Sequence, residues 1–399
     1  MQNGSEQVQA AVIGGGPAGL TAAIALAAGG IETALISKGA PADNRTTALL
    51  SGSVAALEAL EIWREVATHA AALTAIRLID DTRRLIRAPE VLFEADEIAL
   101  PAFGYNVENR HLVRALESRA AALNKLMRIE ASAVAIEAGD DDVTVRLDND
   151  ASVAARLVVG ADGRTSLCRA AAGITTERHD YPQAALTLNL WHTRPHDGVS
   201  TEFHTETGPF TLVPLPGLRS SLVCVVDPDQ AQDLKALTNA ALSDEIERRS
   251  HSILGKITVE DGRGVFPLGV ETARSFAARR IALVGEAAHV IPPIGAQGLN
   301  LGLRDVATIA ELAVESHRNG DDIGGVLARY DRARRADTTG RTVAVDMLNR
   351  SLLSDFLPVQ GVRGLGLYAL SRIAPLRRAL MREGVEPAAQ PRLMRGEAL

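Results

Sequence analysis

A glycine-rich turn near the N-terminus constrains the fold of this chain more than any other feature. An apolar run, Val8–Ile13, precedes the turn, and a run rich in Ala and Leu, Pro17–Ala28, follows it; between them stands Gly14-x-Gly16-x-x-Gly19. A further apolar run covers Thr33–Ile36. This order predicts a strand, a tight turn, a helix and a second, parallel strand, because such crossover units join parallel strands.

The glycines of this turn suit the binding of a dinucleotide. They permit a tight turn and let a pyrophosphate approach the free N–H groups of a helix N-terminus, although a plain turn of small residues would also satisfy the pattern. In such folds an acidic residue about 20 residues further on usually binds the adenosine ribose. Here Ser37 stands at that place. Because a hydroxyl cannot make the charge-assisted bond, the pattern favours FAD, which has many other contacts, over NAD.

Two helices and a set of antiparallel strands are expected between residues 51 and 162. Ser51 and Asn109 each stand where they can cap a helix, the first ending near Glu65 and the second near Leu123. Residues 129–162 alternate apolar and polar side chains around acidic turns, which predicts antiparallel strands.

The chain then forms a second β layer and returns to the first type of fold. A buried strand and a helix are expected at Arg280–Gly285 and Gly298–His317. Before them, Pro and Gly separate the strand-like runs Ala185–Leu190, Phe210–Pro214 and Ser221–Val226. We therefore expect an α/β protein in which a Rossmann-like FAD-binding domain with a parallel sheet is interleaved with a mostly antiparallel β substrate domain, plus C-terminal helices. The expected boundaries are 1–72, 102–177 and 272–350 for the FAD-binding domain, 73–101 and 178–271 for the substrate domain, and 351–399 for the C-terminal helical segment.

The charge and composition exclude several classes of function. With 46% hydrophobic and 23% charged residues, the chain of 399 residues has the composition of an ordinary globular protein. Its net charge of −7 and its 3% of aromatic residues argue against nucleic acid as a partner. Cys168 and Cys224 are too few for a disulfide framework or a metal site by themselves, so no metal is expected and a reducing, cytoplasmic compartment fits best.

Two later motifs carry the same kind of chemistry as the glycine turn. The run from Val158 to Arg169 reads as a strand that leads into Asp162-Gly163, although Asp-Gly is also a common turn dipeptide. The third motif of the chain, Gly285-Glu286, follows a strand, and a stretch rich in Gly and Pro separates it from a helix. A loop of this composition that opens a helix is suited to the close approach of a flat ligand.

In their order and over nearly the full length, these three motifs resemble those of the para-hydroxybenzoate hydroxylase superfamily of FAD-dependent monooxygenases. Within it, Gln297–Asp305 and Arg45–Leu49 are similar to the ubiquinone-biosynthesis hydroxylases, of the 2-polyprenyl-6-methoxyphenol hydroxylase type. The chain departs from the pattern twice, with Ser37 in place of the ribose acid and Glu286 in place of an aspartate. The resemblance implies that FAD is bound by Gly14, Gly16, Gly19, Ser37, Arg45, Arg110, Asp162, Gly163, Gly285, Glu286, Pro293, Gly298, Leu299 and Asn300.

The resemblance also implies the reaction, the hydroxylation of an aromatic ring. In the family, NAD(P)H reduces the FAD, O₂ adds to the flavin as a C4a-hydroperoxide, and a carbon of a phenol attacks the distal oxygen. The implied substrate is a polyprenylated phenol of ubiquinone biosynthesis, and the expected pocket strands, almost free of Lys and Arg, suit such an apolar ligand. No catalytic residue is assigned, because a lone polar residue is more often structural; those near the expected pocket or flavin loop are His204, Tyr181, His192 and His289.

The segment from Val359 to the C-terminus carries seven arginines against three glutamates, with apolar side chains between them. One interpretation is a helix packed on the FAD-binding domain with a solvated basic face. The other is a peripheral membrane contact that helps a lipid-tailed substrate to enter. The implied partners are the prenylated phenol, O₂, a membrane surface under the second interpretation, and other enzymes of ubiquinone biosynthesis.

Other functions on the same fold stay open from the sequence. The chain would also suit a flavin hydroxylase of a soluble aromatic compound, and the two departures from the motifs suit an FAD-binding, non-catalytic subunit of a biosynthetic complex. A prenyl reductase or a flavin halogenase are further alternatives. Halogenases of the superfamily carry a Trp-x-Trp-x-Ile-Pro segment, whereas Trp63 and Trp191 are isolated here.

Overall fold

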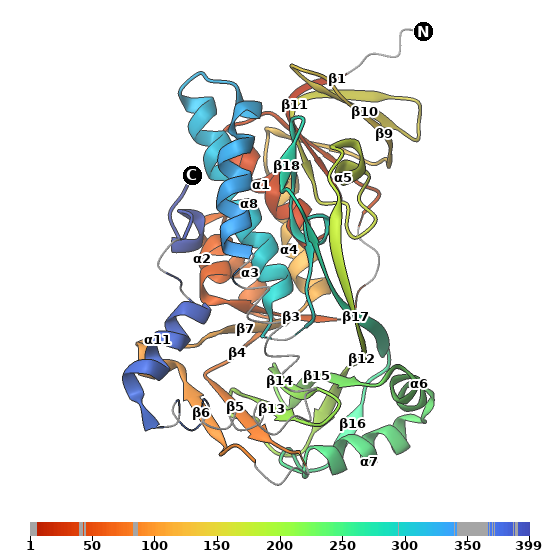
Figure 1. The fold of residues 1–399 in the computed structure, drawn as a ribbon, viewed down its shortest axis with the longest axis vertical. Helices are drawn as coiled ribbons and strands as arrows, with labels where there is room; N and C mark the ends of the chain where they lie inside the picture. The colour runs from red at the N-terminus through yellow and green to blue at the C-terminus, as the bar shows by residue number, and fades with distance from the viewer. Residues whose placement is uncertain are drawn as a thin grey trace.

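Two large sheets lie one above the other along the long axis of the molecule (Figure 1). In this computed structural model, the upper part holds helices α1 (Pro17–Ala28) and α8 (Gln297–Arg318), and the lower part holds α6 (Pro228–Ala236) and α7 (Asn239–Arg249) beneath a broad, mainly antiparallel sheet. The structure describes residues 6–39, 43, 45–82, 87–293, 295–338, 340, 366, 368, 370, 372–385, 387 and 390–399.

The upper sheet is mainly parallel and contains the N-terminal strand–helix–strand unit. Its strands follow the order β18-β19-β11-β1-β2-β8, and β10 and β9 extend it as an antiparallel hairpin on β11. The register places Val12 beside both Val159 and Leu35. The strand bounds are β1 (Glu6–Ile13), β2 (Thr33–Ile36), β8 (Leu126–Ile129), β9 (Ala133–Ala138), β10 (Val143–Leu147), β11 (Ser152–Gly160), β18 (Ala277–Ala278) and β19 (Ile281–Leu283).

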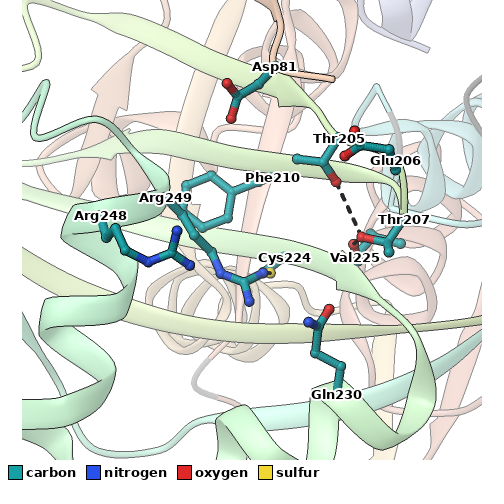
Figure 2. Close-up of a pocket in the computed structure, with 10 residues that line it drawn as sticks. All are labelled: Asp81, Thr205, Glu206, Thr207, Phe210, Cys224, Val225, Gln230, Arg248 and Arg249. Atoms are coloured by element: carbon teal, nitrogen blue, oxygen red, sulfur yellow. Dashed lines mark hydrogen bonds between the residues drawn. The ribbon is translucent and has the colours of Figure 1, made fainter. Parts of the chain in front are cut away.

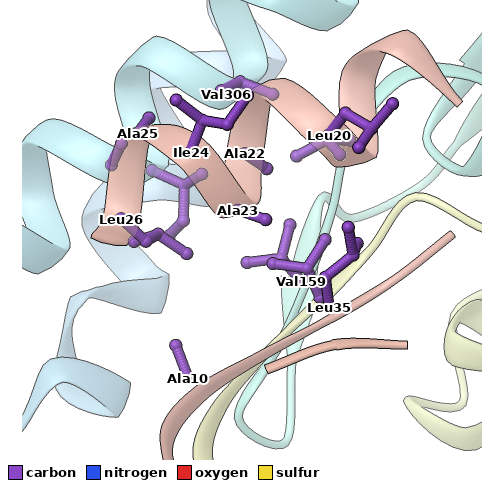
Figure 3. Packing of buried hydrophobic residues seen from close by; sticks show 14 of the residues in the cluster. Ala10, Leu20, Ala22, Ala23, Ile24, Ala25, Leu26, Leu35, Val159 and Val306 are labelled. Carbon is purple, nitrogen blue, oxygen red and sulfur yellow. The ribbon is translucent and has the colours of Figure 1, made fainter. Parts of the chain in front are cut away.

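The first helix, α1 (Pro17–Ala28), is buried on almost every side because it lies between this sheet and α8 (Gln297–Arg318). Figure 3 shows Leu35 and Val159 of the sheet on one side of α1 and Val306 of α8 on the other. Because the alanine side chains of α1 are short, the sheet and α8 can both pack closely against this helix. A methyl group on Gly29 would lie 2.2 Å from a methyl of Val314, which indicates how tight this layer is.

The lower sheet is antiparallel except for one pair, β5 with β13. Its strands follow the order β20-β17-β12-β15-β14-β13-β5-β6, with β16 (Ile257–Val259) on β12. Helices α6 (Pro228–Ala236) and α7 (Asn239–Arg249) cover one face of it. The strand bounds are β5 (Ala75–Asp80), β6 (Val91–Glu94), β12 (Thr176–His192), β13 (Val199–His204), β14 (Pro209–Leu215), β15 (Arg219–Val226), β17 (Gly264–Ala273) and β20 (His289–Val290).

A small sheet joins the two parts. Its order is β3-β7-β4, and on β7 the amide of Asn106 donates hydrogen bonds to the lower sheet, to Pro214 O at 2.9 Å and Ser221 Oγ at 3.1 Å. The face of the lower sheet that α6 and α7 leave uncovered is therefore turned towards the upper part. The remaining bounds here are β3 (Thr46–Leu50), α2 (Ser51–Ala59), α3 (Trp63–Ala67), β4 (Ala70–Ala72), β7 (Gly104–Glu108), α4 (Asn109–Ala121) and α5 (Leu167–Ala171).

The sequence predictions of secondary structure hold in type and fail in detail. The strand–helix–strand unit, the two later helices, the second β layer and the helix near residue 298 are confirmed. The caps are wrong: Leu50 and Glu108 precede the helices, while Ser51 and Asn109 lie inside them. The helix expected from Ser51 to about Glu65 is two helices, one that ends at Ala59 and another that begins at Trp63. Among the strands expected to be antiparallel, β11 pairs in parallel with β1 as well as antiparallel with β10.

Of the C-terminal helical segment, the structure describes α11 (Ala374–Val385), which lies beside β6 (Figure 1), and the last ten residues. The rest of the expected helical segment, residues 351–365 and positions 367, 369, 371, 386, 388 and 389, lies outside the described residues. Among the residues that the structure describes, no helix is both long and apolar enough to cross a membrane.

Candidate functional site

The three glycines of the first turn differ in what surrounds them. A Cβ on Gly14, whose φ is +117°, would lie 2.2 Å from Ala161 O, and one on Gly19 would lie 2.0 Å from Gly14 O. Both positions therefore require glycine for the turn itself. A Cβ on Gly16 would have no described atom within 4 Å, and no side chain caps α1. The helix N-terminus is thus open at Gly16, as an anion-binding helix end must be.

Ser37 borders this turn at the end of β2. Its hydroxyl accepts a hydrogen bond from the N–H of Gly39 at 3.0 Å. A Cβ on Gly15 would lie 2.1 Å from Ser37 Oγ, so the side chain is in direct proximity to the glycine turn. The hydroxyl hydrogen is free to donate to a neighbouring acceptor.

The Asp162-Gly163 motif follows β11 and lies beside the glycine turn, because Ala161 N–H donates to Ile13 O. Asp162 accepts from Ser166 Oγ at 2.6 Å and from the N–H of Cys168 at 3.0 Å. Both carboxylate oxygens therefore hold the turn that leads into α5. Gly163 has a φ of +79°, which a residue with a Cβ rarely adopts.

The Gly285 turn rests on a buried carboxylate of α8. Asp305 Oδ2 accepts from the Gly285 N–H at 3.0 Å and lies 2.7 Å from His289 Nε2, and Asp305 Oδ1 accepts from Arg334 Nε at 2.6 Å. Burial alone would raise the pKa of Asp305, but the charges of His289 and Arg334 lower it overall. Asp305 is fully buried and ionised. The hydrogen bond that it accepts from the Gly285 N–H holds the Gly285 backbone, whose φ is +60°, in place.

A second layer of charges supports this carboxylate. Asp337 accepts from Arg304 Nε at 2.9 Å and from Arg334 at 2.6 Å, and Tyr330 donates to Leu283 O at 2.6 Å. Burial raises the pKa of Tyr330 well above its usual value, so it stays a neutral donor. The helix of residues 327–338 thereby ties α8 to β19 directly behind the turn.

Glu286 points away from that network and towards the second motif. Its side chain is 53% exposed and lies 3.3 Å from Arg164 Nε, one residue after Gly163. An exposed pair of this kind contributes little to stability. The carboxylate is therefore available at the surface between the second and third motifs.

The N-terminus of α8 is open, like that of α1. Ala296 precedes it with a φ of +55° and no side chain caps it, and a Cβ on Gly298 would meet no described atom within 4 Å. Pro293 and Gly298 are exposed and Leu299 is partly buried. Asn300 is buried and fixes the helix end: its amide donates to Ala48 O and Ala296 O and accepts from Leu50 N–H and Ser53 Oγ.

The two arginines expected near the flavin lie in different surroundings. Arg45 forms a bidentate pair with Asp43, both bonds 2.9 Å long, and its guanidinium lies 5.4 Å from the ring centre of Phe266 on β17. The hydrogen bond to Asp43 raises the pKa of Arg45. Arg110 instead pairs with Glu108 at 2.9 Å. Arg45 thus lies between the upper part and the lower sheet. Sequence analysis did not single out Asp43 or Phe266, because neither belongs to a motif.

Three of the four polar residues considered near the pocket have structural surroundings. His192 lies on the face of β12 that turns to the helices, bonded to Ser220 Oγ at 3.1 Å and Arg194 O at 2.8 Å, and burial lowers its pKa. His289 belongs to the Asp305 network. Tyr181 is buried, edge-on to a histidine ring. His204 pairs with Glu202 at 2.8 Å.

A cavity of about 430 Å³ lies on the lower part, far from these motifs (Figure 2). Arg248 and Arg249 of α7, Phe210 and Cys224 line it, with Arg249 Nη1 3.8 Å from Cys224 Sγ, and none of the motif residues does. Burial raises the pKa of Cys224 to about 11, so the thiol stays protonated at neutral pH. We do not assign the chemistry to this cavity, because the open helix ends lie elsewhere.

The site thus consists of two open helix N-termini, α1 and α8, with three glycine-containing turns between them at the carboxyl ends of β1, β11 and β19. A helix end without a cap binds phosphate or a developing negative charge, and glycines admit a flat ligand between. This arrangement fits a flavin dinucleotide, with its pyrophosphate at α1. The fold and the site therefore define an FAD-binding oxidoreductase.

Comparison with known proteins supports an FAD-binding oxidoreductase. The family described as FAD binding domain matches residues 7–342. The chain is 36% identical to "Ubiquinone hydroxylase UbiL" of Rhodospirillum rubrum, over 97% of this chain and 92% of that protein. It is 32% identical to "3-demethoxyubiquinol 3-hydroxylase" of Escherichia coli, over 95% and 98%. The chain belongs to the FAD-dependent monooxygenases, in the UbiH-like branch of the ubiquinone hydroxylases.

Solved structures show the same fold. The p-nitrophenol 4-monooxygenase PnpA from Pseudomonas putida superimposes with a TM-score of 0.79 at 20% identity, covering 96% of this chain and 100% of that one. The flavin-dependent monooxygenase PieE, solved with FAD and substrate, gives a TM-score of 0.70 at 20% identity, covering 98% and 72%. The expected α/β fold is therefore confirmed.

Proposed function

We propose that this enzyme hydroxylates the aromatic ring of a polyprenylated phenol in ubiquinone biosynthesis, with NAD(P)H and O₂ as co-substrates. The observation that carries the proposal is the similarity to ubiquinone hydroxylases over nearly the whole of each chain. The face of the lower sheet opposite the flavin motifs is partly exposed and mixes apolar with polar side chains. Its arginine, Arg219, is already paired with Glu108 and Glu260, whereas a benzoate-type substrate would call for an unpaired cation.

The FAD would be held by the residues of the three motifs. Gly16 admits the pyrophosphate to the α1 N-terminus, and Ser37 donates to the ribose. The exposed Glu286 carboxylate accepts from the ribityl chain, close to Arg164. Bound there, FAD supplies the activation of O₂.

The chain's own groups have three tasks at this site. The open N-terminus of α8, with Pro293, Gly298 and Leu299, stabilises negative charge on the flavin ring. Arg45 lies over Phe266 and bridges the two parts of the molecule where the ring would be. The lower sheet excludes water from the reacting atoms.

The division into domains belongs to the same proposal. Residues 1–72, 102–177 and 272–350 form the FAD-binding domain, and 73–101 and 178–271 form the substrate domain. Separate apolar cores support it: one combines residues of β1, α1, β11 and α8, and another combines β12 to β15 with α6 and α7.

A peripheral membrane contact by α11 completes the proposal, because a prenylated substrate resides in a bilayer. Ile373, Leu376 and Leu380 are each about half exposed and follow helical spacing, at 49%, 48% and 51%. Arg372 and Arg378 are exposed beside them, whereas Arg377 is paired with Glu97. Apolar side chains flanked by cations suit the surface of an anionic bilayer.

The membrane contact is tested by sedimentation with vesicles. Wild-type protein is expected to bind vesicles that contain phosphatidylglycerol and to bind pure phosphatidylcholine weakly. The double variant Leu376→Glu with Leu380→Glu should lose this binding, and a control with glutamate at the exposed Val134 of β9 should keep it. Equal binding by all three proteins would refute a contact through α11.

The substrate is tested by turnover. Purified enzyme is expected to oxidise NAD(P)H faster when a prenylated phenol is added and to yield a product with one more oxygen. Rapid hydroxylation of para-hydroxybenzoate, with no turnover of the prenylated phenol, would refute the lipid substrate.

A further inference from the structure

One ionisable side chain lies within a partly exposed strip across the lower sheet. Strand pairing places Leu78, Glu202, Thr211, Val223 and Thr187 side by side on β5, β13, β14, β15 and β12. All five are partly exposed, whereas Phe203 and Phe210, their neighbours on the opposite face, are buried against α6 and α7. Of the five residues only Glu202 carries an ionisable group.

This strip faces the flavin motifs. Ser221, two residues before Val223, accepts the hydrogen bond from the amide of Asn106 on β7. Two residues before Thr187, Ala185 pairs with Phe266, the ring under Arg45. Alternate residues of a strand share a face, so contacts from the upper part border the strip on both sides. A phenol ring held between the two parts would therefore lie against it.

The carboxylate of Glu202 is held in place by two neighbouring side chains. Its Oε1 lies 2.8 Å from Nε2 of His204, whose exposure is 3%, and its Oε2 accepts from Thr211 Oγ1 at 3.2 Å. His204 pairs across the sheet with Asp80 of β5, whose carboxylate accepts from Thr82 and from the N–H of Ala88. Each oxygen of Glu202 has one more lone pair for a ligand.

We propose that Glu202 accepts the hydroxyl proton of the substrate phenol, with His204 and Thr211 as positioning residues; this rests on the proposed function. As the ring carbon takes up one atom of O₂, the O–O bond breaks and the other atom leaves as water; the phenol O–H bond breaks and an O–H bond forms on Glu202. When the ring loses its C–H proton to solvent and becomes aromatic again, Glu202 returns its proton to the phenol oxygen. O₂ and NAD(P)H supply the oxidant and the reductant, so the carboxylate ends as it began.

Without this acceptor, the reaction must wait for phenol that has ionised in solution. General-base help of this kind is worth about a hundredfold to ten-thousandfold in rate. Glu202→Gln keeps the size and the hydrogen-bond partners of the side chain but cannot take a proton. We expect it to retain FAD and substrate affinity and to hydroxylate a short-chain prenylated phenol at least about a hundredfold more slowly.

The pH dependence separates a proton acceptor from a structural residue. The rate of the wild-type enzyme should change little across neutral and mildly alkaline pH, whereas that of Glu202→Gln should rise about tenfold per pH unit as phenolate forms. Glu202→Asp should recover part of the rate with the wild-type profile. Glu177→Gln, at an exposed position of β12, is the matched control and should behave as wild type.

Two results would overturn the inference. A Glu202→Gln enzyme with the wild-type rate would do so, as would a slow one whose profile stays flat, because a structural defect lowers the rate at every pH alike. Thermal unfolding and flavin content identify a damaged fold. If the wild-type enzyme itself fails to hydroxylate any prenylated phenol, the proposed function fails instead.

Discussion

Replacing Gly16 by Val is expected to remove FAD without harming the fold. The added atoms meet no described protein atom within 4 Å of Cβ, and the backbone of Gly16, with φ −73° and ψ 174°, suits any residue. They enter the space over the α1 N-terminus where the pyrophosphate would lie. The loss of two hydrogen bonds from backbone N–H groups to the charged pyrophosphate, each worth roughly 1.5 to 3 kcal/mol, should weaken FAD binding by about 3 to 6 kcal/mol, which is more than a hundredfold.

The assay compares flavin content with stability. Gly16→Val should purify without flavin absorbance, while its apoprotein unfolds in urea at the same midpoint as wild-type apoprotein. Gly19→Val is the contrasting variant, because its Cβ would meet Gly14 O at 2.0 Å and the apoprotein itself should be destabilised. A Gly16→Val protein that binds FAD as tightly as the wild type would refute the assignment of the pyrophosphate to this turn.

Charges around the Gly285 turn give three further expected outcomes. Glu286→Ala should cost roughly 1 to 3 kcal/mol of FAD affinity, measured by titrating apoprotein with FAD; an unchanged affinity would leave Glu286 only its contact with Arg164. Asp305→Asn should lower the free energy of unfolding by about 3 to 5 kcal/mol, because the charge on Arg334 stays buried; a loss below about 1 kcal/mol in urea would contradict this. Burial raises the pKa of Asp305 and Asp337, but their cationic partners lower it overall, so the stability they contribute is complete above about pH 4 and is lost as pH falls further; urea midpoints that stay constant down to about pH 2 would contradict it.

The sequence was sufficient for the fold class because its strongest signals are local. A glycine turn between an apolar strand and an alanine-rich helix admits few other structures, and Gly14 and Gly19 are required by backbone contacts that the spacing already implies. Helix ends were less predictable. Asn109 has the residue type of a cap, but its side chain accepts from Thr47 and donates to Asp43 instead, so tertiary contacts decided its role.

The candidate site was predicted only as far as its motifs extend. Asp305 was visible as the end of a family-like run, yet its function as the buried anchor of Gly285 depends on Arg334, which carries no motif. The Glu202 strip depends on the register of five strands, which residue types alone do not fix. Phe266 reaches Arg45 across more than two hundred residues of chain, for the same reason.

The proposed reaction inserts one atom of O₂ into a prenylated phenol. The direct measurement is a reaction with NADPH, a prenylated phenol and isotopically labelled O₂, followed by mass spectrometry of the extracted product. We expect a hydroxylated phenol that carries one labelled oxygen, formed only by flavin-loaded protein. Oxidation of NADPH that the phenol does not accelerate, with the phenol recovered unchanged, would contradict it.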